Sequence, residues 1–136
     1  MTGRFVLTNP RLSTTGDSVA DFTKLKVWQA AHAFTLEAYR ITARFPREEQ
    51  FGLTSQVRRA AISIAANIAE STGRHHGPDQ ARFLQVAKGS TTELRSHLLI
   101  ARDLGFVTPE ERSTADLRLD QIERMLASLL RYYKTH

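Results

Sequence analysis

Residues 51–74 read FGLTSQVRRAAISIAANIAESTGR and predict a single helix. An ordinary surface helix carries one apolar stripe, whereas small or apolar residues occur on most sides of this one. We therefore expect it to be buried on most sides. Thr54 is expected to cap its first turn, and Gly73 to end its last turn in a left-handed conformation. The small and apolar positions are Val57, Ala60, Ala61, Ile62, Ile64, Ala65, Ala66, Ile68 and Ala69.

A thin polar line remains on this helix. Gln56, Ser63 and Glu70 are seven residues apart, and Arg59 and Asn67 lie beside them. Polar groups on so apolar a helix need hydrogen-bond partners, which we expect to come from other helices or other subunits. A four-helix core uses only one stripe of each helix. The surplus apolar surface therefore indicates a subunit interface, and hence more than one subunit.

Three further segments repeat apolar residues at steps of three and four, the spacing of a helix-bundle seam. They predict helices at about 24–45, 78–104 and 109–133, in addition to the helix at 54–72. Pro46 stops the first of them, because the residue before a proline disfavours helical backbone. The seam residues are Val27, Ala31, Phe34, Ala38, Ile41 and Phe45; Leu84, Ala87, Thr91, Leu94, Leu98 and Ala101; and Ala115, Leu119, Ile122, Leu126, Leu129 and Tyr133.

The ends of the last two helices carry their own signals. Pro78 suits a first helical turn, because the N–H that it lacks would be unpaired there. Gly105 is expected to close the third helix. Thr108 and Glu111 have the spacing of a capping box at the start of the fourth helix. These signals place short loops between the helices.

No segment reads as a strand. Four helices joined by short loops predict an all-α protein, an antiparallel up-down-up-down four-helix bundle at residues 21–136. Residues 1–20 mix Thr, Ser, Gly, Asn and Pro without a helical period, which predicts a flexible tail. The alternative for this segment is an arm that docks on a partner through Arg4, Phe5 and Arg11.

Composition narrows the range of partners. The 136-residue chain has 19 Lys and Arg against 14 Asp and Glu, so its net charge is +5 and RNA, DNA or an acidic protein is the expected partner. The absence of cysteine excludes disulfides, thiol catalysis and thiolate metal sites, and it fits a reducing compartment. No apolar run approaches the ~20 residues of a membrane span, and the first residues lack a secretory pattern. We therefore expect a cytoplasmic protein with no membrane partner.

The sequence lacks motifs for catalysis or metal binding. No glutamate has a histidine three residues later, as a di-iron bundle requires, and no two histidines have the i, i+4 spacing of helical metal ligands. Glu93 and His97 are four residues apart, and we interpret them as a surface hydrogen bond. There is no Gly-rich phosphate loop and no G-x-S-x-G motif. The sequence therefore predicts no enzymatic activity, no metal and no cofactor.

Basic residues on the second and third helices are candidates for nucleic-acid contacts. Those on the third helix are seven residues apart and therefore share one face. This face is either an ordinary solvated surface or a track for phosphates, whose affinity would fall with salt. No aromatic residues interleave with it, so base stacking is not expected and binding should be weakly sequence-specific. The six candidates are Arg58, Arg59, Arg74, Lys88, Arg95 and Arg102.

Three segments resemble a known family: LKVWQAA (25–31), FPREEQFGLTSQVRRAAISIAANIAESTGR (45–74) and FLQVAKGSTTELRSHLLIARDLG (83–105). Over roughly residues 22–132 the chain is similar to the four-helix bundle proteins encoded by intervening sequences in bacterial 23S rRNA genes, also called S23 ribosomal proteins. The resemblance implies an antiparallel bundle, a ring-shaped homopentamer and no enzymatic activity. Ser71 stands where the family commonly has glycine. Because Gly73 and Arg74 remain, we expect the end of this helix to be preserved and to lie about one turn later.

The resemblance also implies partners. In a related branch, the accessory variability determinant of diversity-generating retroelements, a basic barrel binds nucleic acid and a reverse transcriptase. Two hypotheses follow: a homo-oligomeric bundle that binds RNA or DNA through the six basic candidates, or a protein-interaction scaffold such as an accessory subunit for a reverse transcriptase. The polar core or subunit-interface positions that the resemblance implies are Gln56, Arg59, Asn67, Glu70, Ser90 and Glu93.

Overall fold

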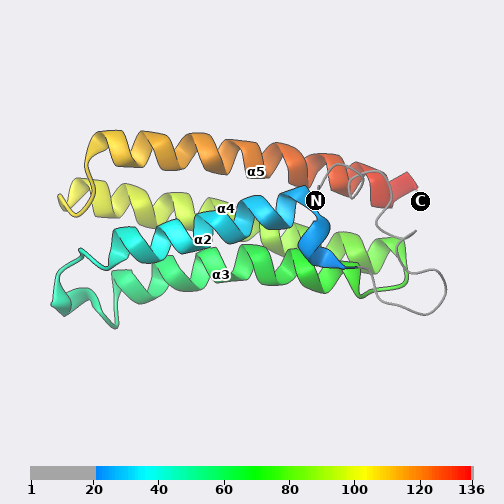
Figure 1. Cartoon of the computed structure of the whole chain (residues 1–136), viewed down its shortest axis with the longest axis horizontal. Coiled ribbons are helices and arrows are strands. Elements are labelled where there is room, and N and C mark those ends of the chain that lie inside the picture. Colours follow the sequence, from blue (N-terminus) through cyan, green and yellow to red (C-terminus); the bar gives the residue numbers. More distant parts are fainter. Residues whose placement is uncertain (1–20, 136) are drawn as a thin grey trace.

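The computed structural model describes residues 21–135, which form four α-helices and two short 3-10 helices and contain no strand. The predicted all-α class is therefore confirmed. Figure 1 shows the four long helices lying side by side, as in a four-helix bundle. The tail expected at residues 1–20, and the alternative docking arm within it, lie outside the described residues. The elements are η2 (Phe22–Lys24), α2 (Lys26–Thr42), η3 (Arg47–Glu49), α3 (Leu53–Thr72), α4 (Gly77–Asp103) and α5 (Pro109–Thr135).

Helix α2 is shorter than the helix expected at 24–45. Leu25 has extended backbone (φ −73°, ψ 127°), which separates the 3-10 turn η2 from the start of α2. At the other end the helix stops at Thr42, and residues 43–45 turn toward Pro46. The α-helix therefore ends before it reaches Pro46, three residues earlier than predicted.

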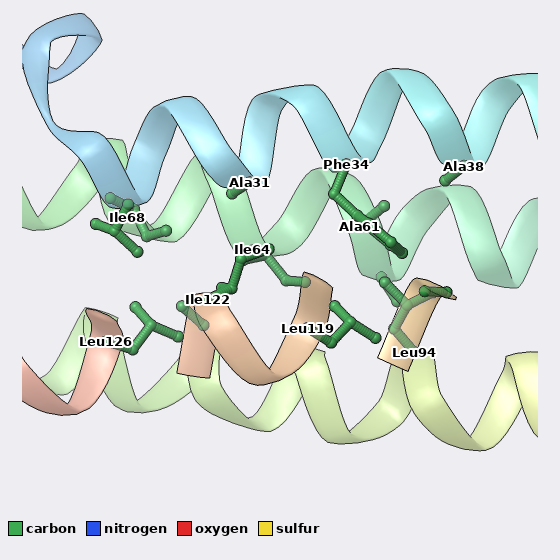
Figure 2. Close-up of a cluster of buried hydrophobic side chains, with 14 of the residues drawn as sticks. Ala31, Phe34, Ala38, Ala61, Ile64, Ile68, Leu94, Leu119, Ile122 and Leu126 are labelled. Atoms are coloured by element: carbon green, nitrogen blue, oxygen red, sulfur yellow. The ribbon is translucent and has the colours of Figure 1, made fainter. Parts of the chain in front are cut away.

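One apolar core lies between the helices. Every seam residue predicted on α2, α4 and α5 is buried, which confirms the three-and-four spacing as the pattern of burial. Helix α3 contributes Val57, Ile64 and Ile68 to the same cluster. Figure 2 shows side chains from all four helices gathered in this space, among them Phe34 and Leu119. Each helix therefore contributes a continuous apolar stripe, and the packing of these stripes holds the four helices together.

Helix α3 buries only part of its apolar surface within one chain. Val57, Ala60, Ala61, Ile64 and Ile68 are buried, and the helix packs most extensively against α4. Ile62, by contrast, is 45% exposed, and Ala66 is exposed as well. The expectation that this helix is buried on most sides is thus not met inside a single chain.

The predicted caps of α3 are wrong. Because the helix begins at Leu53, Thr54 lies inside the first turn and is buried, and the residue before the helix is Gly52. The Glu49 carboxylate takes the capping role and accepts a hydrogen bond of 3.0 Å from the Leu53 N–H. Gly73 has a right-handed backbone (φ −88°), because its N–H donates to the Glu70 carbonyl and closes the last turn as a 3-10 turn.

The signals at the α4–α5 connection are confirmed. Gly105 has φ +81° beyond the last residue of α4, its N–H donates to the Arg102 carbonyl, and the next N–H donates to the carbonyl of Ala101. These two bonds form a Schellman cap. Thr108 and Glu111 exchange hydrogen bonds of 2.9 and 3.0 Å in a capping box. The Thr108 N–H holds the pKa of Glu111 below its ordinary value, and an ion pair with Arg44 adds to this effect.

Candidate nucleic-acid and subunit surfaces

Arg95 lies between α4 and α5 rather than on an open face. Its guanidinium bonds to Asp116 at 3.1 Å, Asp120 at 2.7 Å and Glu123 at 3.1 Å, and its side chain is 23% exposed. Thr91, one turn away on α4, donates to the other Glu123 oxygen. Partial burial lowers the pKa of Arg95, but the hydrogen bonds to Glu123 and Asp120 outweigh it, so the pKa is raised and the group stays charged. The charge of Arg95 is therefore offset within the chain.

Two more of the six basic candidates have carboxylate partners. Arg102 pairs with the adjacent Asp103 at 2.9 Å. Arg74 pairs with Glu70 at 2.6 Å and lies 3.7 Å from Asp79. The charges on these arginines are balanced locally, so each offers less net attraction to a phosphate than its position in the sequence indicates.

The remaining three candidates make no ion pair with a carboxylate within residues 21–135. Arg59 on α3 and Lys88 on α4 are exposed. Arg58 is half-buried, and its Nε donates to the Thr42 hydroxyl at 2.8 Å while the guanidinium carbon lies 4.4 Å from the centre of the Tyr39 ring. The structure thus brings two uncompensated cations together at the start of α3 and leaves the third on α4.

The predicted polar positions are only partly brought together. The hydroxyls of Ser63 and Ser90 lie 2.8 Å apart and join α3 to α4, and the Asn67 amide donates to the hydroxyl and carbonyl of Ser63. Gln56 is half-buried on the preceding turns of α3. Glu93 is exposed and bonds to His97 at 3.2 Å, as the sequence predicted, while Glu70 is exposed and pairs with Arg74.

Sequence reasoning missed the residues that decide which cations are free. The acidic residues at 116, 120 and 123 have helical spacing, which was a signal that they share one face of α5. Their pairing with Arg95 had no local signal, because it depends on how far α5 is displaced along α4. Tyr39 was likewise not among the sequence candidates, yet the guanidinium of Arg58 lies over its ring.

Neither a candidate metal site nor a candidate membrane-spanning helix occurs in residues 21–135. Residues 21–135 contain no group of three or more His, Asp or Glu side chains placed to hold a metal ion. In the same part of the chain, no helix has both the length and the apolar character needed to cross a bilayer.

Helix order, seams and polar contacts define an all-α protein with four packed helices. Comparison with protein families makes this specific: the family model described as 23S rRNA-intervening sequence protein matches residues 23–128, and the chain belongs to this family. The resemblance seen in the sequence is therefore confirmed. The family description gives no catalytic activity.

A solved structure has the same fold. The crystal structure of a protein with unknown function from the S23 ribosomal protein family of Bacteroides thetaiotaomicron matches with a TM-score of 0.69 and 20% identity. The match covers 76% of this chain and 97% of that one. At this identity the likeness shows the fold alone. A search of curated proteins gave no match.

Proposed function

We propose that this protein is a non-enzymatic, homo-oligomeric four-helix bundle that binds RNA or DNA through basic side chains. The observation that carries the proposal is that three of the six basic candidates, Arg58, Arg59 and Lys88, make no ion pair with a carboxylate in residues 21–135. An uncompensated cation on the surface attracts phosphate, whereas an arginine already paired with a carboxylate gains less. The net charge of +5 supports the same conclusion.

The assembly is the second part of the proposal. Exposed apolar side chains lie on the two helices that pack most extensively, namely Ile62 on α3 and Val86 and Ile100 on α4. Covering them with a second copy would bury the surface that one chain leaves open. The up-down-up-down, antiparallel order proposed for the bundle is supported by its short loops, and the ring of five is what the family resemblance implies.

If these three side chains bind phosphates, a variant that lacks all three charges should bind nucleic acid more weakly. Replacing Arg58, Arg59 and Lys88 together with Gln should weaken binding at ~50 mM salt and reduce the slope of log affinity against log salt by roughly 2 to 3, because each phosphate contact contributes about 0.7 to 0.9. Fluorescence anisotropy with labelled RNA and DNA measures both quantities.

A matched control separates local contacts from net charge. Arg40, Arg82 and Arg102 each pair with a carboxylate on the same helix, so changing all three to Gln removes the same formal charge. This control should retain most of the affinity and slope. Equal losses in both triple variants would contradict the proposed contacts, and unchanged binding in the first variant would show that they lie elsewhere.

Assembly predicts a mass several times that of the 15.3 kDa chain. Light scattering after size exclusion, with and without nuclease, should give a nuclease-resistant oligomer of about five chains, the number implied by the family. Replacing Ile62 with Asp should lower this mass while the helical content is kept, because the side chain is 45% exposed within one chain. A monomeric wild-type protein would contradict the proposed assembly.

A further inference from the structure

The segment that contains η3 joins α2 to α3 at one end of the bundle (Figure 1). An open hollow of about 330 Å³ lies there, and no carboxylate is among its lining residues. Cationic, aromatic and amide side chains occur together in it. The lining residues that carry this chemistry, called here the η3-end surface, are Tyr39, Gln50, Phe51, Arg58 and Arg59.

Phe51 is the most exposed large apolar residue among those described. It is 89% exposed, and it makes no ring-to-ring contact with another aromatic residue of the described chain. It directly precedes Gly52, the residue before α3 begins, so the ordered start of the helix fixes the backbone beside it. Its ring is thus available to stack on a planar group, at a defined place on the bundle.

Arg58 lines the same hollow as Phe51 and is held in place there. Thr42 accepts a hydrogen bond from its Nε and Tyr39 lies under its guanidinium, while it makes no ion pair with a carboxylate of residues 21–135. A planar guanidinium fixed in this way loses little freedom when it binds a phosphate oxygen. Arg59, the next residue, is exposed and adds a second cation to the hollow.

We infer that the η3-end surface binds single-stranded nucleic acid, with a base stacked on Phe51 and the neighbouring phosphates bound by Arg58 and Arg59. Cations beside an exposed aromatic ring are the two components of such sites. The bases of a duplex are stacked on one another, so their faces cannot reach the Phe51 ring. Because no carboxylate lines the hollow, the charge of this surface is complementary to that of a phosphate chain.

This inference rests on the proposed function and differs from one sequence expectation. Stacking was not expected, because no aromatic residue interleaves with the cations of α4. The aromatic residues of the η3-end surface come instead from α2 and from the loop before α3. The cations and rings are therefore brought together by the fold, from segments that are not adjacent in the sequence.

The test compares single-stranded and duplex binding in the full-length protein. Replacing Phe51 with Ala should lower the affinity for labelled oligo(U) about 5- to 100-fold, the usual effect of losing one stacked base, without changing the salt slope. Affinity for a duplex of the same length should stay unchanged. Replacing Phe51 with Trp should keep the affinity, and strand binding should quench the added fluorescence.

Leu117→Ala is the matched control, since Leu117 on α5 is 69% exposed and lies outside the hollow. It should not change binding. If Phe51→Ala binds oligo(U) as the wild type does, with the wild-type salt slope, the stacking site is refuted and the proposed function stands. If the wild-type protein binds neither strand nor duplex, the proposed function fails as well. A lower oligomer mass for Phe51→Ala would identify the surface as a subunit contact and refute the inference.

Discussion

Replacing Ile64 with Asp should unfold the protein at 25 °C or lower its free energy of unfolding by more than about 4 kcal/mol. Ile64 is 1% exposed and lies in the core among side chains from all four helices (Figure 2). A carboxylate at this position loses its hydration and has no cation to pair with. Domains of this size are typically stable by about 5 to 15 kcal/mol, so a loss of this size removes at least about a quarter of the stability and, at the lower end of the range, most of it.

Circular dichroism during urea unfolding, at one fixed chain concentration, measures the effect. Ile62→Asp is the control, because it makes the same change two residues along the same helix at a position that is 45% exposed. It should keep the wild-type helical signal in the absence of urea. An Ile64→Asp variant that unfolds cooperatively within about 1 kcal/mol of the wild type would contradict the buried placement of this residue.

Replacing Arg95 with Met has the second-largest expected effect. The substitution leaves Asp116, Asp120 and Glu123 close together without their shared cation. Removing one partner of a buried charge pair costs about 3 to 5 kcal/mol, and partial exposure reduces this to about 2 to 3 kcal/mol here. The three carboxylates then repel one another, and salt screens this repulsion. At ~0.5 M salt the variant should therefore regain part of its lost free energy of unfolding.

Urea unfolding at two salt concentrations checks this expectation. Arg102→Met should cost less than about 0.5 kcal/mol, because Arg102 pairs only with the adjacent, exposed Asp103. Adding Asp120→Asn and Glu123→Gln to Arg95→Met should restore stability, because these two charges are then gone and Asp116 keeps an ion pair of 3.2 Å with Arg112. Failure of this rescue would show that the arginine acts through packing of its aliphatic stem rather than through its charge.

The helices could be predicted because their signal is local and repeated. Residues such as Leu84, Ala87 and Leu94 lie on one side of a helix whatever it packs against, so their spacing identifies the buried face. The capping box of Thr108 and Glu111 is equally local, since both partners lie within one turn. The apolar spacing and the capping box depend only on residues that are near each other in the sequence. They can therefore be predicted without knowing how the helices are arranged.

The candidate site could be predicted only in part, because its chemistry depends on contacts between segments. Lys88 and Arg95 are equivalent in the sequence, seven residues apart on one face. The structure leaves Lys88 exposed and surrounds Arg95 with carboxylates from α5. The predicted cap of α3 was wrong for a similar reason. The residue that caps the helix, Glu49, belongs to the preceding 3-10 turn, and its carboxylate meets the Leu53 N–H only because of the conformation of the loop between them.

The carboxylates around Arg95 also determine the register of α5 against α4. Asp116, Asp120 and Glu123 span two turns of α5 and meet at one guanidinium. A slip of α5 by one turn, about 5.4 Å, would keep two of these three carboxylates beside Arg95, while the third place would be taken by Arg112 in one direction and by Ala127 in the other. Either shift therefore loses one of the three ion pairs of Arg95, and the first also adds repulsion between two arginines. The core alone tolerates such slips because its apolar residues repeat every turn, so the charge pattern selects one alignment among several that the core would accept.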